Sequence, residues 1–314
     1  MKKILHYNTP LLESTPMRSY QKKKNSRFYL KMEALQPTHS FKIRGIGHLC
    51  QKATQEGFNH FISSSGGNAG LATAYSARVL GKKSTIFVPT TTTKSVVTRL
   101  RMEDAQVIIK GDVWDETHLH AINYADQITG KLVHPFDDPD LFIGHSSMIQ
   151  EVHESGASFD LVVCSVGGGG LLCGIIEGLV NLGLTNIPVV AVETKGSASF
   201  AKSYDLKKLT PINQIDTIAT SLGAKQISKT AFEWIDKHPI ISHLVSDKLA
   251  LQACQKFSYD HKVLVEPACG AALSLAYDPN SLLKDYKNIL FIVCGGVGAS
   301  IEKYSDWQKK TFHS

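Results

Sequence analysis

The stretch LVVCSVGGGGLLCGII, residues 161–176, decides the fold class of this chain. It begins with a run of apolar, mostly β-branched residues, passes through four successive glycines and ends in a second apolar run. The whole stretch is shorter than a membrane span, and the glycines interrupt it. A buried strand, a tight turn and a helix fit this pattern, and they are the unit from which parallel α/β sheets are built.

The same unit recurs along the chain in two series. In the first, three β-rich runs are each followed by a helix-compatible segment, and in the second the strands are near-continuous apolar runs. These strands are HFISSS (60–65), STIFVP (84–89) and QVIIK (106–110) in the first series, and LVVCSV (161–166), IPVVAVE (187–193) and NILFIVCGG (288–296) in the second. Two series predict an α/β protein with two parallel-sheet domains.

The pattern changes near residues 135–140, where the sequence HPFDDPD interrupts it with prolines and acidic residues. We expect a large cofactor-binding domain made of residues 1–44 and 139–314, and a small domain made of residues 45–138. No low-complexity linker or internal repeat separates the two.

The composition excludes several classes of function. The 314 residues are 43% apolar and 20% charged, which is typical of a soluble globular protein. The net charge of +6 comes from scattered lysines, and the short basic run at residues 22–24 has no interleaved aromatic residues, so we expect a solvated turn and no nucleic-acid partner. The N-terminus does not read as a signal peptide, and no segment reads as a membrane span. Six cysteines without metal-ligand spacing predict reduced core thiols and a cytoplasmic location.

Three glycine-rich turns follow predicted strands, where ligands gather in open α/β sheets. They are SSSGGNAG (63–70), SVGGGGLL (165–172) and CGGVGAS (294–300). The four glycines of the second turn can present consecutive backbone N–H groups at the start of a helix, which favours a bound phosphate. A dinucleotide-binding GxGxxG motif fails, because its last position falls on Leu172 or Cys173.

Lys42 lies at the start of a predicted helix, in the stretch THSFKIRGIGHL, residues 38–49. A single phosphate site together with a lysine in this position suggests pyridoxal phosphate, whose aldehyde forms a Schiff base with a lysine amine. The first glycine-rich turn then suits a substrate carboxylate, because its small residues leave backbone amides open. The amide of Asn68 could donate to the phenolic oxygen of the cofactor.

Five motifs in order, SFKIRG, SSSGGNAG, SVGGGGLLCG, LVEPACGAAL and IVCGG, resemble those of the serine/threonine dehydratases. These are pyridoxal-phosphate enzymes of fold type II, the tryptophan-synthase β-like class, and the closest resemblance is to the L-serine dehydratase and serine-dehydratase-like group. It covers nearly the whole chain. The resemblance implies a lyase that converts L-serine or L-threonine to pyruvate or 2-oxobutanoate plus ammonia by β-elimination, and a homodimer.

The resemblance also implies a role for individual residues. Lys42 would hold the cofactor and act in catalysis, Phe41 would pack beside its ring, and Cys294 would approach the ring nitrogen. The remaining assignments are the O3' contact of Asn68, the phosphate loop of Gly167, Gly168, Gly169, Gly170 and Leu171, the substrate-carboxylate clamp of Ser65, Gly66, Asn68 and Ala69, and a monovalent cation, K⁺, held by Glu193, Ser197, Ser199, Leu222 and Ala224.

Alternatives stay open at this point. A serine racemase or a β-replacing synthase would use the same fold and cofactor, and a non-catalytic module would bind an amino acid without turnover. Val297 and Gly298 stand where relatives tend to carry polar residues, which puts in doubt any contact made by those side chains. Because Gly66 stands where one subgroup has alanine, the preference between serine and threonine is also open.

Overall fold

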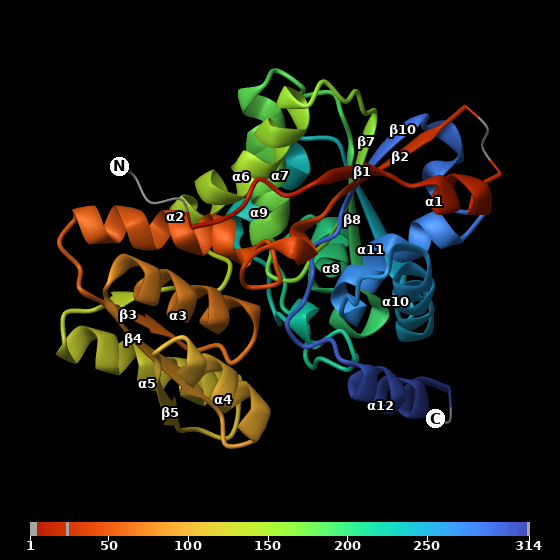
Figure 1. Cartoon of the computed structure of the whole chain (residues 1–314). Helices are drawn as coiled ribbons and strands as arrows, with labels where there is room; N and C mark the ends of the chain where they lie inside the picture. The colour runs from red at the N-terminus through yellow and green to blue at the C-terminus, as the bar shows by residue number, and fades with distance from the viewer. Residues whose placement is uncertain (1–4, 23–24, 313–314) are drawn as a thin grey trace.

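The strands of the protein form two sheets in the computed structural model, which describes residues 5–22 and 25–312 (Figure 1). The six-stranded sheet has the order β1-β2-β10-β7-β8-β9, and the four-stranded sheet has the order β5-β4-β3-β6. The strands are β1 (Leu11–Glu13), β2 (Arg27–Lys31), β3 (His60–Ser63), β4 (Lys83–Val88), β5 (Gln106–Ile109), β6 (Lys131–Leu132), β7 (Leu161–Ser165), β8 (Val189–Thr194), β9 (Ile240–Val245) and β10 (Asn288–Ile292).

The predicted fold class is confirmed, because each series of predicted strands lies in a sheet of its own and neighbouring strands pair in parallel. One pairing differs from the prediction: the short edge strand β1 runs antiparallel to β2. The domain boundary stays a prediction, and helix α2 (Lys42–Gln55) runs across the division expected between residues 44 and 45.

Helices cover both sheets. In Figure 1, α6 and α7 lie on one side of the large sheet, α10 and α11 lie on the other, and α3, α4 and α5 surround the small sheet. The remaining helix bounds are α1 (Thr15–Tyr20), α3 (Asn68–Leu80), α4 (Lys94–Met102), α5 (Trp114–Gln127), α6 (Pro139–Glu154), α7 (Gly170–Asn181), α8 (Ser199–Leu206), α9 (Lys229–Glu233), α10 (Asp247–His261), α11 (Pro267–Tyr277) and α12 (Ile301–Phe312).

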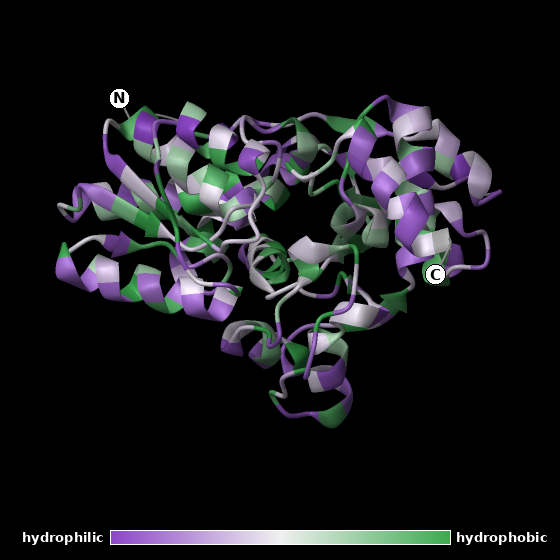
Figure 2. Ribbon diagram, turned by 90° about the horizontal axis from the view of Figure 1, so that it is seen from below, coloured by the Kyte–Doolittle hydropathy of each residue, from purple (hydrophilic) through white to green (hydrophobic). Residues whose placement is uncertain are grey.

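The central strands carry the core. Every residue of β7 and β8 is buried, as expected for parallel strands covered on both faces. Figure 2 shows hydrophilic residues gathered on the outer helices, while hydrophobic residues lie toward the interior. All six cysteines are buried and free. None of the helices in the described ranges is long and apolar enough to cross a membrane.

Two predictions fall partly outside the described residues. In the basic run at residues 22–24, Lys22 lies in a turn with a φ of 53°, and the other two lysines are not described. Residues 1–4 of the N-terminal segment are likewise outside the described ranges.

Helix α2 approaches α6 very closely, and glycines permit it. A Cβ atom on Gly144 would lie 2.4 Å from the carbonyl oxygen of Arg44, and one on Gly45 would lie 2.6 Å from the ring of His145. These glycines therefore serve helix packing, and the close approach carries the side chain of Arg44 into the space between α6 and the N-terminal segments.

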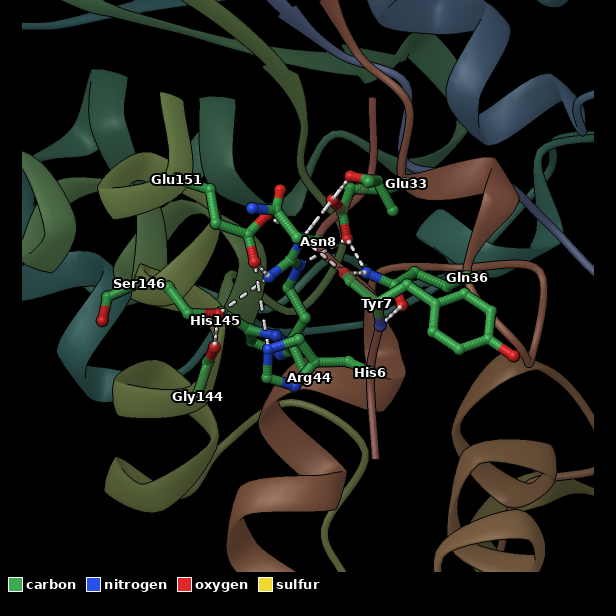
Figure 3. Close-up of polar contacts among 12 residues, drawn as sticks. His6, Tyr7, Asn8, Glu33, Gln36, Arg44, Gly144, His145, Ser146 and Glu151 are labelled. Atoms are coloured by element: carbon green, nitrogen blue, oxygen red, sulfur yellow. Dashed lines mark hydrogen bonds and ion pairs between the residues drawn. The ribbon is translucent and has the colours of Figure 1, made fainter. Parts of the chain in front are cut away.

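Arg44 is at the centre of a buried ionic network (Figure 3). Its guanidinium bonds to both oxygens of Glu33 at 2.7 and 2.8 Å, and to both oxygens of Glu151 at 2.7 and 2.6 Å. Lys31 adds an ion pair to Glu151, and the Thr9 hydroxyl donates to Glu33 at 2.6 Å. Arg44 and Glu33 are completely buried, so each charge depends on its partners for compensation.

Replacement of Arg44 by methionine should destabilise the fold strongly. The change leaves two carboxylates without their main partner in the interior, and breaking a buried ion pair in this way costs about 3–5 kcal/mol. The measurement is the free energy of unfolding in urea. Lys52→Met is the matched control, since its ion pair with Asp140 is exposed on the lysine side and should be worth less than about 1 kcal/mol. Equal losses in the two variants would contradict this account.

Candidate active site

Lys42 is the first residue of α2, and the turn before it is fixed to the segment that follows β10. The backbone N–H of Phe41 donates to the carbonyl of Cys294 at 3.2 Å, and Ser40 forms an isolated β-bridge with Gly295. Gly295 has a φ of 95°, and a Cβ atom there would lie 2.2 Å from the carbonyl oxygen of His39. The glycine-rich turn after β10 therefore has a structural role, because it lets the chain pass close to the lysine turn.

The amine of Lys42 contacts a backbone carbonyl and an aromatic ring. It donates a hydrogen bond to the carbonyl oxygen of Pro135 and lies 5.1 Å from the centre of the Phe41 ring. Burial lowers the pKa of Lys42 to about 8, and the nearby Cys294 and Glu266 only partly oppose this effect. About one Lys42 amine in ten is therefore uncharged at pH 7, far more than for an ordinary lysine, and a nucleophile or a general base requires this uncharged form.

The predicted carboxylate clamp lies at the start of α3. The Ser65 hydroxyl accepts from the backbone N–H of Gly67 at 3.3 Å and so shapes the turn. Gly70 must be a glycine, because a Cβ atom would lie 1.6 Å from the Ser65 carbonyl oxygen. Among the described residues, no acceptor contacts the backbone N–H groups of Ser65, Gly66, Asn68 and Ala69. Four donors are thus open at a helix N-terminus, where an anion is favoured.

The predicted phosphate loop joins β7 to α7. Gly169 has a φ of 96°, and within the described ranges no acceptor contacts the N–H groups of Gly167, Gly168, Gly169, Gly170 and Leu171. A Cβ atom on Gly168 would lie 2.2 Å from the ring of Phe136, and one on Gly167 would lie 3.0 Å from the Cα atom of Leu222. The glycines thus have two roles. They leave backbone N–H groups open, and they make room for Phe136 and Leu222 beside the loop.

The predicted cofactor residues are brought together by shared neighbours. Pro135 accepts from Lys42, and the adjacent Phe136 packs on the phosphate loop. Asn68 bonds to Glu266, whose charge acts on Lys42. A lysine amine of lowered pKa, linked through Pro135 and Glu266 to two helix N-termini with open N–H groups, fits pyridoxal phosphate, which needs an amine for its aldehyde and donors for its phosphate.

Cys294 is a neutral thiol in this structure. A hydrogen bond with Cys269 and burial both raise the pKa of Cys294. A neutral thiol beside a pyridine nitrogen would not force that nitrogen to become protonated as a carboxylate would.

Contacts connect only some of the residues that were predicted to bind a cation. Both carboxylate oxygens of Glu193 accept backbone N–H groups at the start of α8, from Phe200 and Ala201, each at 2.8 Å. Burial raises the pKa of Glu193 to about 8. Ser199 begins the same helix, and its buried hydroxyl has no hydrogen-bond partner among the described residues.

The other predicted cation ligands lie on neighbouring segments. Ser197 ends the 3-10 segment η2 (Lys195–Ser197), and its hydroxyl bonds to that of Thr194. Leu222 ends η3 (Thr220–Leu222), and its carbonyl accepts from the N–H of Ala224 at 2.8 Å. The described residues contain no group of three or more His, Cys, Asp or Glu side chains that could hold a metal ion. A cation here would depend mainly on carbonyl and hydroxyl oxygens.

Three residues of the site were not predicted from the sequence. Glu266 bonds to Asn68, Phe136 packs on the phosphate loop, and His134 accepts the backbone N–H groups of Phe136 and Asp137. Burial lowers the pKa of His134 to about 4, with His118 and Lys42 adding to the effect. Glu266 lies within the quoted motif LVEPACGAAL, but an acid before a proline is also an ordinary helix start, so its position alone gave no signal.

Two cavities meet at Glu266. The smaller one, about 130 Å³, borders the carboxylate clamp at Gly66 and Asn68. The larger one, about 800 Å³, lies beyond Glu266 between η3 and α12. Thr220, Ser221, Glu266 and Gly298 line both cavities, and Lys42 lines neither. The contacts of Lys42, Asn68 and the glycine loop, and not the size of the larger cavity, therefore define the candidate site.

Known proteins resemble this chain over nearly its whole length. The L-serine dehydratase of Dictyostelium discoideum is 41% identical over 96% of this chain and 91% of its own length. The human L-serine dehydratase/L-threonine deaminase is 40% identical over 95% of this chain and 93% of its own length. The crystal structure of a fungal L-serine ammonia-lyase from Rhizomucor miehei superposes with a TM-score of 0.90 at 34% identity, and the match covers 98% of this chain and 100% of that one.

A family model described as pyridoxal-phosphate dependent enzyme matches residues 3–295. This range contains both sheets, the lysine turn, the first two glycine-rich turns and the start of the third. The chain belongs to the pyridoxal-phosphate dependent enzyme family.

Proposed function

We propose that this protein is an L-serine/L-threonine ammonia-lyase, which converts these amino acids to pyruvate or 2-oxobutanoate and ammonia. The observation that carries the proposal is the amine of Lys42, whose pKa is lowered to about 8 and whose neighbours Pro135 and Glu266 connect it to two helix N-termini with open N–H groups. Relatives that are 40 to 41% identical and are named L-serine dehydratases support the choice of substrate.

Each predicted site residue receives a role in this proposal. The N–H groups of the loop from Gly167 to Leu171 hold the cofactor phosphate, and Phe41 packs beside the ring. The amide of Asn68 would donate to the phenolic oxygen, and Cys294 would face the ring nitrogen as a neutral thiol. The N–H groups at Ser65, Gly66, Asn68 and Ala69 hold the substrate carboxylate.

When bound, pyridoxal phosphate supplies the electron sink that makes the α-proton of the amino acid acidic. The uncharged amine of Lys42 removes this proton as general base. Loss of the β-hydroxyl as water leaves an enamine, which hydrolyses to the 2-oxo acid and ammonia. A pKa of about 8 suits this role, because a base works best when its pKa lies near the working pH.

L-serine supplied alone distinguishes the proposed reaction from its nearest relatives. We expect pyruvate and ammonia in equal amounts, whereas D-serine as main product would indicate a racemase. Little product without an added nucleophile would indicate a β-replacing synthase, and binding without turnover would indicate a non-catalytic module.

Lys42→Ala should abolish turnover and the covalent attachment of the cofactor, and full activity in this variant would reject the assignment. Parallel assays with L-threonine measure the substrate preference.

We propose further that K⁺ binds beside Glu193, with Ser197, Ser199, Leu222 and Ala224 as the other ligands. The supporting observations are the unpartnered hydroxyl of Ser199 and the carboxyl of Glu193, whose pKa burial raises to about 8. A bound cation would favour the ionised carboxylate.

The cation proposal predicts a melting temperature that depends on the ion. A ligand that binds only the folded state stabilises it by RT ln(1 + [L]/Kd). The melting temperature should therefore be higher in KCl than in tetramethylammonium chloride of the same ionic strength. Glu193→Gln should abolish the difference. Identical melting temperatures and turnover in the two salts would contradict a functional cation.

We also propose a homodimer located in the cytoplasm. Symmetric dimers are the commonest assemblies of soluble proteins. Light scattering of the purified chain should give a mass near twice 34.4 kDa, and a single species of 34.4 kDa would refute the dimer. Cell fractionation tests the compartment.

A further inference from the structure

Glu266 joins three separate segments through one buried carboxylate. It precedes the first residue of α11 and is 7% exposed. Its oxygen accepts a hydrogen bond from the side-chain amide of Asn68 at 2.9 Å, and the Ser221 side chain and the backbone N–H of Gly298 also favour its ionised form. These groups belong to α3 beside the small sheet, to η3 and to the turn after β10, so the carboxylate lies between α3 and segments that follow strands of the large sheet.

The amide of Asn68 has only one orientation that satisfies its neighbours. Its oxygen accepts the backbone N–H of Val297 at 2.9 Å, and its nitrogen donates to Glu266. A backbone N–H can only donate and an ionised carboxylate can only accept, so a flipped amide would lose both bonds. One N–H of the amide is left for another acceptor. Val297 takes part through its backbone, so its apolar side chain does not disturb the contact.

The turn after β10 is shaped around the carboxylate. A Cβ atom on Gly296, whose φ is 141°, would lie 2.1 Å from the Cγ atom of Glu266, and one on Gly298 would lie 3.3 Å from its Oε2 atom. No larger residue fits at Gly296 without moving Glu266. The chain therefore places this acid against the turn even though a buried carboxylate carries a desolvation cost.

We propose that Glu266 is a positioning residue that orients the Asn68 amide toward the phenolic oxygen of the cofactor and supplies the negative charge that acts on Lys42. The inference rests on the proposed role of Asn68 and adds a residue to it. Glu266 acts across the boundary between the sheets, so it couples the placement of the small sheet to the cofactor site.

The charges around Lys42 make this second role specific. Burial disfavours the protonated amine, and the ionised carboxylate of Glu266 favours it. Cys294 is a neutral thiol, and the imidazoles of His134 and His145, whose pKa values are lowered mainly by burial, are neutral as well. Burial raises the pKa of Glu266, while Ser221, Asn68, the backbone of Gly298 and the charge of Lys42 favour its ionised form, so Glu266 is the group acting on Lys42 that can carry a negative charge.

Glu266→Gln tests both roles in the apoprotein. A charged hydrogen bond to Asn68 becomes a neutral one, so the affinity for pyridoxal phosphate should fall by roughly tenfold, measured by fluorescence titration. The rate at which Lys42 captures the cofactor should rise with pH with a midpoint near 8 in the natural protein, and at lower pH in the variant. A merely structural role would not move this midpoint.

Glu177→Gln is the matched control, because Glu177 is a half-buried carboxyl on α7 whose pKa is raised to about 7 by burial alone. It should leave both the affinity and the midpoint unchanged. Glu266→Asp retains the charge on a shorter side chain, so it should keep the midpoint near 8 and still weaken cofactor binding.

The outcomes separate this inference from the proposed function. Unchanged affinity and midpoint in Glu266→Gln, with normal cofactor binding by the natural protein, would overturn the inference and leave the function intact. Failure of both Glu266 variants to fold, judged by circular dichroism and melting temperature, would also overturn it in favour of a structural role. A natural protein that neither binds the cofactor nor consumes serine would refute the proposed function itself.

Discussion

The bonds from Arg44 to Glu33 and Glu151 are the constraint on which the placement of Lys42 depends. The guanidinium bonds to one carboxylate that follows β2 and to another on α6, so it fixes helix α2 against both at once. Removing such charges from water costs several kcal/mol each, and only good geometry returns that cost. Because Lys42 lies half a turn before Arg44 on the same helix, α2 cannot rotate or slide without breaking these bonds.

Local patterns in the sequence were sufficient to predict strands β3, β4, β5, β7, β8 and β10 and the glycine-rich turns that follow β3, β7 and β10, but not β1, β2, β6 or β9. Near-continuous apolar runs such as β7 are buried on both faces, and that burial requires parallel strands under helices. The carboxyl ends of parallel strands meet at one edge of a sheet, which is why the turns after β7 and β10 could be assigned to one site, whereas the turn after β3 belongs to the other sheet and was assigned to the site through its small residues and the family resemblance. The family resemblance added the roles of individual residues toward the cofactor, the substrate and the cation, and these roles are proposals.

Contacts between distant segments could not be predicted from the sequence. Arg44 and Glu151 are 107 residues apart, and Asn68 and Glu266 are 198 apart, so no local period connects them. The antiparallel edge strand β1 is only three residues long and leaves little pattern. The packing of Phe136 on Gly168 also could not be predicted, because the sequence does not show whether a glycine is required by a ligand or by a neighbouring ring.

The basicity of Lys42 depends on a balance between burial and one carboxylate. Burial disfavours the charged amine and accounts for most of the lowered pKa, while the negative charge of Glu266 opposes it. Both influences depend on how the two sheets meet, because Glu266 lies on α11 and bonds to Asn68 at the start of α3. A movement that separated the sheets would admit water to Lys42, weaken the interaction with Glu266 and release the Asn68 amide together. Under the proposed role of Asn68, the same contact would influence both the charge state of the amine and the orientation of the amide.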